Sequence, residues 1–254
     1  MSRWQAFGIH LSLSALLLSI LLAVIMWVWY PGILFNVDGG WTGLRIVIGV
    51  DLVLGPLLTL IVFKAGKPGL KFDLTAIAVF QLSCMAAGMW IVYSERPLAL
   101  VLAHDTIYSI AAAEFEEYAQ DPEILRDFPG SYPKLVYTEL PEGEVAADVA
   151  VLRSQFIGDP LYIQTERYRA ITMENAQSVF RREDAVRQSV TDELNERLPE
   201  NCVFAKFVSV VTSGYVCFDA ENMRLDSFYE NDYRRDADAG AGDVAEANDD
   251  SAAE

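Results

Sequence analysis

Residues 7–30 read FGIHLSLSALLLSILLAVIMWVWY, and His10 is the only titratable residue among them near neutral pH. About 20 consecutive apolar residues are enough for a helix to cross a bilayer core of roughly 30 Å. The stretch closes with two tryptophans and a tyrosine, which favour the headgroup level of a membrane. A cleaved signal peptide is the alternative, but the apolar core is too long and no small-residue cleavage site precedes Pro31. We therefore expect an uncleaved membrane anchor.

Two more apolar stretches follow the first one. Residues 44–63 are mostly apolar, with an acid, a glycine and a proline in their interior, and residues 74–94 contain no charge. The sequence thus predicts three transmembrane helices, at about residues 7–30, 44–63 and 74–94, within a membrane region that covers residues 1–96. The lipid bilayer is the first partner that the sequence implies.

The short loops predict the orientation of these helices. The loop at residues 64–71 contains three lysines and Arg3 precedes the first helix, whereas the loop at residues 31–41 carries only Asp38. Positively charged loops stay in the cytoplasm, so the N-terminus and the lysine loop are expected there. With three spans, everything after residue 95 lies outside. In a Gram-negative bacterium this means an inner-membrane protein with a periplasmic C-terminal domain.

Charge divides the 254-residue chain, whose formal net charge is −17. Residues 1–96 contain six Lys and Arg residues against four acids, and the remainder contains thirteen against thirty-two. This pattern excludes a wholly soluble protein and a nucleic-acid binder that uses a basic patch. The three cysteines exclude a small scaffold held together by many disulfides.

The acidic part is long enough for one domain with its own core, at residues 97–235. We expect it to be an extracytoplasmic α+β domain. Apolar alternation predicts strands at 98–103, 134–139, 202–211 and 215–219 and an extended segment at 161–171, while helical periodicity predicts helices at 106–120, 141–156 and 173–198. Residues 236–254 contain no base and no aromatic residue, so an acidic disordered tail is expected there.

Cys202 and Cys217 lie in the predicted hairpin, fifteen positions apart. In an oxidising compartment a structural disulfide is the expected state of such a pair. A simple hairpin centred on Ser213 does not place them directly opposite, so the bond needs a bulge, a longer strand or a diagonal approach. A redox-active pair usually has the Cys-x-x-Cys spacing, which this pair lacks.

Asp51 lies inside the second predicted span, where an acid is costly and normally faces protein or water. Its expected depth is the outer part of the membrane, near aromatic side chains whose N–H and O–H groups could satisfy it. These are Trp27, Trp29 and Tyr93.

Gly55 and Pro56 follow this acid, and the proline removes one bond of the helix. Two interpretations of Asp51 remain open. In one, a broken helix forms an ion or proton site or a docking surface for another span. In the other, Asp51 is an internally satisfied structural acid beside a proline kink.

No catalytic motif accompanies these features. The sequence has no Walker loop, dinucleotide fingerprint, zinc spacing or nucleophile elbow. His104 and Asp105 resemble half of a catalytic pair, but no suitably placed nucleophile or further histidine supports that function. We expect no catalytic, cofactor-binding or metal-binding residues, and an active site at Asp51 is the least favoured interpretation.

Several stretches of the membrane region resemble the type IV pilin accessory protein family. These are MSRWQAFGIH at residues 1–10, WYPG at 29–32, DGGW at 38–41, GVDLVLGPLLT at 49–59 and FKAGKPGLKFD at 63–73. The resemblance covers residues 1–97 well and the outer domain thinly, through GYVCF at residues 214–218. It implies a non-enzymatic protein that acts with one cognate major type IV pilin and influences its stability, its assembly into pili or the dynamics of the pilus, and so twitching motility.

Such a partner has an apolar helix in the membrane and a globular head outside it. Gly49 and Gly55 allow close helix approach only locally, because their spacing of six does not form one seam. Our hypothesis is that the second span, with Lys64 and Lys67 in the following loop, holds the pilin helix while the outer domain selects the head. The pilus assembly platform is a further possible partner. The alternative function is a membrane-anchored periplasmic sensor or scaffold that signals through a partner protein.

Overall fold

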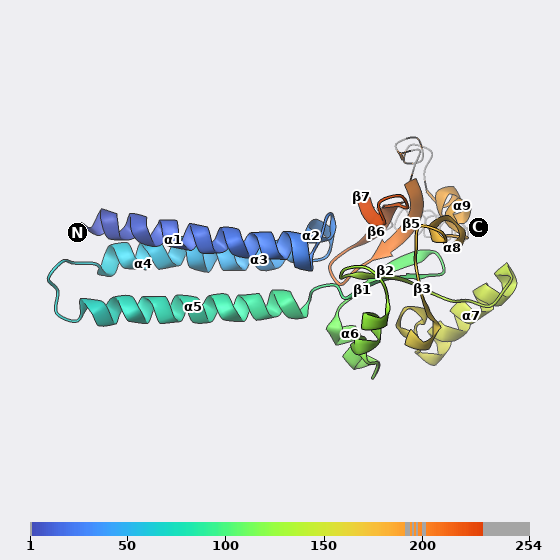
Figure 1. Cartoon of the computed structure of the whole chain (residues 1–254), viewed down its shortest axis with the longest axis horizontal. Coiled ribbons are helices and arrows are strands. Elements are labelled where there is room, and N and C mark those ends of the chain that lie inside the picture. Colours follow the sequence, from blue (N-terminus) through green and yellow to red (C-terminus); the bar gives the residue numbers. More distant parts are fainter. Residues whose placement is uncertain (1, 191–193, 195, 197, 200–201, 231–254) are drawn as a thin grey trace, which may run out of the picture.

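The computed structural model describes residues 2–190, 194, 196, 198–199 and 202–230. Three long helices run alongside one another and lead into a domain built on a sheet (Figure 1). The predicted acidic tail, residues 236–254, lies outside the described residues.

The three long helices are built from six segments. They are α1 (Arg3–Val24) with the π-helical turn η1 (Ile25–Trp29), then α3 (Gly40–Ile48), the π-helical turn η2 (Gly49–Leu54) and α4 (Gly55–Val62), and finally α5 (Leu70–Ser94). By length and composition the segments Arg3–Trp29, Gly40–Val62 and Leu70–Ser94 can each cross a membrane, which agrees with the three predicted spans. Each begins four residues before its predicted start, because a polar first turn can belong to a membrane helix. At the N-terminus Ser2 and Gln5 cap each other's backbone N–H groups and fix this early start.

The outer domain contains one mixed seven-stranded sheet. Its strands are β1 (Ala99–Ala103), β2 (Thr106–Ile110), β3 (Lys134–Thr138), β4 (Tyr168–Ala170), β5 (Cys202–Val208), β6 (Ser213–Asp219) and β7 (Arg224–Glu230). Their spatial order is β4-β3-β1-β2-β5-β6-β7. The β1–β3 and β2–β5 pairs are parallel and the other pairs are antiparallel, so the α+β prediction holds as a mixed sheet with helices.

The predicted helix at residues 106–120 is wrong over its first third. Residues Thr106–Ile110 form β2, and the helix α6 covers only Ala112–Glu117. The reason is the tight turn at His104 and Asp105, which folds β2 back onto β1, and His104 adopts a positive φ of 63° there. Once the hairpin forms, the β-branched and aromatic residues of this segment fit a strand better than a helix.

Several other boundaries also differ from the sequence prediction. The helix expected from residue 141 begins three residues later, as α7 (Glu144–Ile157). The segment expected to be extended at 161–171 forms two 3₁₀ turns before β4, η4 (Leu161–Ile163) and η5 (Thr165–Arg167). In place of one helix at 173–198, the described residues form the short helices α8 (Ala176–Val179) and α9 (Glu183–Gln188). The strand β7 was not predicted, and the 3₁₀ turn η3 (Pro122–Asp127) follows α6. The 202–219 hairpin is present, with a turn at residues 209–212.

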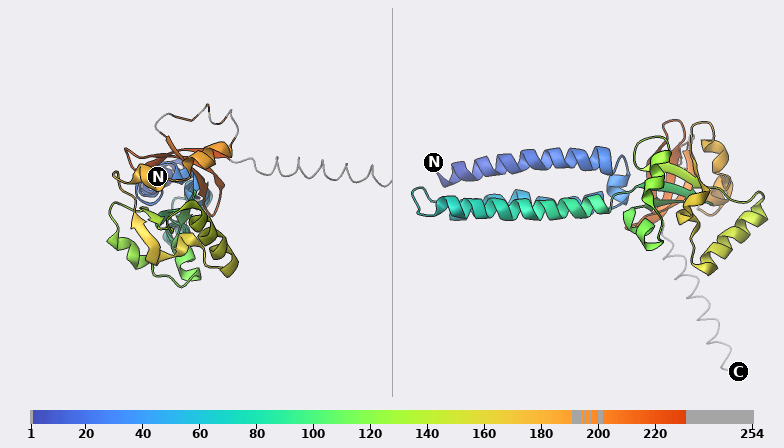
Figure 2. Two further views of the ribbon diagram at one scale, coloured as in Figure 1. Left: turned by 90° about the vertical axis from the view of Figure 1, so that its right-hand side faces the viewer. Right: turned by 60° about the horizontal axis from the view of Figure 1, so that its bottom comes forward.

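The helical bundle and the sheet share one core. The loop after the first long helix, including the short helix α2 (Leu34–Val37), lies between the bundle and the sheet (Figures 1 and 2). Tyr30, Leu34 and Phe35 from this loop pack in one cluster with Leu100 of β1 and Phe218 of β6. The opposite face of the sheet packs against α6, η3 and η4. Both faces of β1 are therefore buried, which explains why it is apolar throughout.

Candidate functional site

Asp51 is the most unusual side chain of the helical bundle. It lies eleven residues from either end of the segment Gly40–Val62, which is the middle of the second long helix. Its residue is only 4% exposed, and neither carboxyl oxygen has a hydrogen-bond partner among the described residues. A charged residue in the middle of a transmembrane helix costs about 3 kcal/mol on membrane-insertion scales. Such a residue in a span is a candidate functional group.

The backbone at Asp51 is a π-helical turn rather than an α-helix. The N–H of Gly55 donates to the carbonyl of Val50, five residues earlier. Pro56 has no N–H, so it cannot donate the bond that an α-helix requires at that position. The wider turn absorbs this interruption and places Asp51 on the buried side of the helix.

A chain of hydrogen bonds beside Asp51 joins all three long helices. The distance from His10 Nδ1 to Thr59 Oγ1 is 2.5 Å, and that from His10 Nε2 to Gln81 Oε1 is 2.8 Å. Gln81 Nε2 donates to Ser14 Oγ at 3.1 Å and to the backbone carbonyl of Asp51 at 3.0 Å. His10 Nε2 donates to Gln81 Oε1, because this amide oxygen can only accept. The network satisfies four polar side chains but leaves the Asp51 carboxyl outside it.

One sequence-based expectation about this region is therefore wrong. Asp51 does not lie at the depth of Trp29 and Tyr93, which contact each other near the sheet end of the bundle with ring centroids 5.3 Å apart. It lies at the level of Ser14 and Gln81 because the second helix begins at Gly40. Both ring nitrogens of His10 bond inside the bundle at this level.

The two glycines that the sequence singled out, Gly49 and Gly55, have different surroundings in the structure. Gly55 and Pro56 are buried and face the other helices. A Cβ atom added at Gly55 would lie 2.6 Å from Gln81 Cδ, whereas one added at Gly49 would meet nothing within 4 Å. Gly55 thus makes room for the Gln81 side chain, and Gly49 faces outward from the bundle.

Replacing Gly55 with valine should lower the stability of the bundle by about 1–3 kcal/mol, the usual cost of overpacking. The new side chain would displace Gln81 and break its bonds to His10 and Ser14. Thermal unfolding of the full chain in detergent, followed by tryptophan fluorescence, measures this directly, because all five tryptophans lie in residues 4–90. Gly49→Val is the matched control and should leave the midpoint unchanged; equal midpoints for both variants would contradict the prediction.

The two candidate lysines lie in the loop at the opposite end of the bundle from the sheet (Figure 1). Lys67 Nζ forms an ion pair with Asp73 at 2.6 Å, with both side chains partly exposed. Lys64 is exposed and takes part in no ion pair among the described residues. Of the two, Lys64 is the one whose charge is available to another molecule.

Comparisons with known proteins give this geometry a context. The chain is 36% identical to the fimbrial assembly protein of Dichelobacter nodosus serogroups C1 and C2 over 103 residues, which are 39% of this chain and 78% of that protein. This chain belongs to the fimbrial assembly protein family. It is also 33% identical over 127 residues to the fimbrial assembly proteins of serogroup I and serogroup E1 of the same organism. Those matches cover 48% of this chain and 49% of each relative, so the chain spans about half the length of these two proteins. No family model and no solved structure matches.

A second buried acid of this fimbrial assembly family member lies where the bundle meets the sheet. Asp38 is 8% exposed, and its Oδ2 accepts a hydrogen bond from Ser109 Oγ of β2 at 2.6 Å. The neighbouring Val37 carbonyl accepts one from Ser209 Oγ at 2.9 Å. Burial raises the pKa of Asp38 to about 7, because a buried carboxylate loses its hydration. Hydrogen bonds from Ser109 and Ser209 lower the pKa by a smaller amount, and the nearby charge of Glu114 raises it further. The sequence marked Asp38 only as a loop charge, and nothing in the local pattern reveals its partners.

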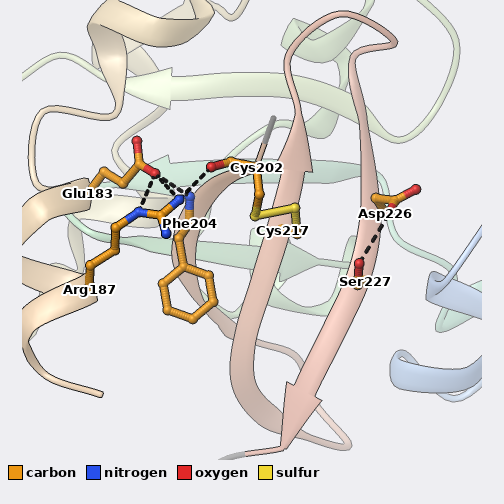
Figure 3. The surroundings of a disulfide bond; sticks show 7 residues. All are labelled: Glu183, Arg187, Cys202, Phe204, Cys217, Asp226 and Ser227. Carbon is orange, nitrogen blue, oxygen red and sulfur yellow. Dashed lines mark hydrogen bonds and ion pairs between the residues drawn. A yellow bond between two sulfur atoms is a disulfide. The ribbon is translucent and has the colours of Figure 1, made fainter. Parts of the chain in front are cut away.

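Cys202 and Cys217 form a disulfide with Cα atoms 5.2 Å apart. In the strand register Cys217 is opposite Phe204, so the two cysteines approach diagonally across the hairpin. Beside them, Glu183 and Arg187 of α9 bind the backbone of β5 at residues 202–204, where β5 extends beyond its neighbour β2 (Figure 3). Glu183 accepts the Phe204 N–H at 3.1 Å, and Arg187 donates to the Cys202 carbonyl at 2.7 Å. The disulfide and α9 together close this end of the sheet.

The His104–Asp105 turn belongs to a group of paired charges. Lys206 Nζ lies 2.8 Å from Asp105, and His104 Nε2 lies 3.0 Å from Asp148 of α7. Burial alone would raise the pKa of Asp105, but bonds from His104, Lys206 and Thr106 outweigh it and hold that pKa below its usual range. These charges satisfy one another and tie the turn to α7 and β5. Among the described residues, no group of three or more His, Cys, Asp or Glu could hold a metal ion.

Proposed function

We propose that this chain is a type IV pilin accessory protein, a non-enzymatic inner-membrane factor that assists the stability, assembly or dynamics of its cognate pilin. The observation that carries the proposal is the 36% identity to a fimbrial assembly protein over 78% of that protein's length. Three helices able to cross a membrane and an outer sheet domain suit a protein that meets its partner both in and above the bilayer.

The proposal includes a location and an orientation. The N-terminus and the lysine loop lie in the cytoplasm, and the sheet domain lies in the periplasm. The distribution of charge supports this arrangement, since Lys64, Lys67 and Lys71 all lie in or beside one loop while the other loop carries only an acid. The disulfide of the outer domain supports an oxidising compartment.

An exposed apolar stripe supports protein contact by the outer domain. Val145, Val149, Leu152 and Phe156 recur along α7 at helical spacing, and each is more than half exposed. Figure 1 shows α7 at the end of the domain away from the bundle. This surface is our candidate for the contact with the pilin head.

In-cell photocrosslinking from residues placed at Gly49, Lys67 and Phe156 tests the function. The expected result is capture of the major pilin from a membrane position, from Phe156, or from both. Capture of other membrane proteins alone, with pilin abundant but never crosslinked, would overturn the proposal in favour of a sensor or scaffold.

Replacing both Lys64 and Lys67 with serine should reduce co-purification of pilin in detergent by roughly 25-fold. A lysine beside a membrane contributes about 1 kcal/mol to an attraction of this kind, which is about fivefold for each residue, and the two factors multiply. Lys71→Ser is the matched control, and a periplasmic reporter fused to the C-terminus checks that the topology is retained. Undiminished co-purification of pilin by the double variant would exclude the lysines from the contact.

A further inference from the structure

A narrow groove in the bundle lies between α1 and α5 and reaches Asp51. Its cavity of about 160 Å³ is lined by Leu13 and Leu17 of α1, by Leu82 and Met85 of α5, and by Asp51 of the second helix. Figure 2 (right) shows α1 in blue and α5 in green running along each other. Leu13 and Leu82 are 65% and 54% exposed, which means that the groove opens to the surroundings of the bundle.

Among the described residues, neither carboxyl oxygen of Asp51 accepts a hydrogen bond, although the Gln81 side chain is close enough to influence the carboxyl group. Both N–H groups of Gln81 are used, one by Ser14 and one by the backbone carbonyl of Asp51. His10 donates to Gln81, and Thr59 is committed to His10. The carboxyl group therefore has no hydrogen-bond partner in the described part of the chain, although only 4% of the surface of Asp51 is exposed. Lipid tails cannot supply a donor, because they contain no polar hydrogen.

Two exposed serines near the middle of the long helices offer no free hydroxyl hydrogen to a second copy of this chain. Ser19 Oγ donates to the Ala15 carbonyl, and Ser83 Oγ donates to the Val79 carbonyl. We therefore look for the donor in a different protein.

We propose that a transmembrane helix of a partner protein docks in the α1–α5 groove and donates a hydrogen bond from an N–H or ammonium group to Asp51. This docking rests on the membrane location in the proposed function, but not on the pilin being the partner. The apolar walls formed by Leu13, Leu17 and Leu82 receive the partner's helix, and Asp51 selects one that carries a donor at mid-membrane depth.

The test is in-cell photocrosslinking of the full chain from residues placed at Leu13 and at Leu82. The expected result is capture of a transmembrane segment of another protein with Lys, Arg, His, Asn, Gln or Trp at the contact. Asp51→Leu should reduce the yield roughly three- to tenfold, the usual range for one hydrogen bond between membrane helices. Replacing the partner's donor with leucine should give the same loss, with no further loss when both changes are combined. Asp51→Asn keeps an acceptor oxygen and should retain part of the yield.

The thermal midpoint of Asp51→Leu in detergent separates docking from folding. An acid without an internal partner can be removed without loss, so the midpoint should equal or exceed that of the parent chain. A lower midpoint would identify a structural acid and overturn the proposal. Capture of a second copy, or capture unaffected by Asp51→Leu, would overturn it as well. If Gly49 or Phe156 captures pilin while Leu13 and Leu82 capture nothing, the groove fails and the proposed function stands.

Discussion

Raising the pH from 4 to 8 should lower the free energy of unfolding by about 4 kcal/mol because of Asp38, which lies where the bundle meets the sheet. The pKa of this buried carboxyl is raised from 3.8 to about 7 in the folded chain. The folded state therefore binds the proton more tightly than the unfolded state does. The resulting stabilisation is fully present below pH 4 and is lost as the pH rises to about 7. Each unit of difference in pKa corresponds to 1.36 kcal/mol, which gives the magnitude.

The measurement is a pair of calorimetric unfolding series on the full chain in detergent, one for the parent and one for Asp38→Asn. The asparagine carries no charge, so the variant should gain stability over the parent steadily between pH 4 and pH 7. Asp127→Asn removes the same charge from an exposed position and serves as the control. Parallel pH profiles for the parent and Asp38→Asn would show that the buried carboxyl does not titrate in this range.

The three long helices could be predicted from the sequence because apolar length is a local property. Only their starts were misplaced, at polar first turns such as Arg3–Gln5. The β2 strand was missed for a different reason: its residues also fit a helical pattern, and the decision is made by pairing with β1 and β5. Such pairing depends on residues up to a hundred positions away, which no local pattern contains.

In the candidate site, too, local features could be predicted from the sequence and long-range contacts could not. Asp51, Gly55 and Pro56 stand out in the sequence because an acid and a helix breaker are rare in a span. Their roles were not predictable, because His10 and Gln81, which form the hydrogen-bond network beside Asp51, are 41 and 30 residues away in the sequence and come close only through helix packing. Spacing did show that Gly49 and Gly55 lie on different faces, and their opposite surroundings agree with this.

The bundle and the outer domain are joined by more than a linker. Tyr30 donates from its hydroxyl to the Val92 carbonyl at 3.0 Å, and Val92 also packs against Gly43. Together with the Asp38–Ser109 bond, these contacts connect the ends of the three helices to the sheet.

Replacing Cys202 and Cys217 with serine should lower the stability of the outer domain by about 3 kcal/mol, the value for a disulfide that closes a loop of fifteen residues. The expected fall in the calorimetric midpoint is roughly 10 °C for a domain of this size. The loss should concentrate at the Cys202 end of β5, because Arg187 of α9 binds the backbone carbonyl of Cys202 there. Hydrogen exchange at Phe204, whose N–H bonds to Glu183, should rise in the variant.

Cys84 provides the control for this prediction, since it is a free cysteine in the third long helix. Cys84→Ser should leave the outer-domain midpoint unchanged. A reductant should lower the midpoint of the parent chain to that of the double serine variant and leave the variant itself unaffected. If the parent and the double variant unfold at the same temperature without reductant, the pair contributes nothing to stability. The bonds from Glu183 and Arg187 would then be what holds this end of the sheet.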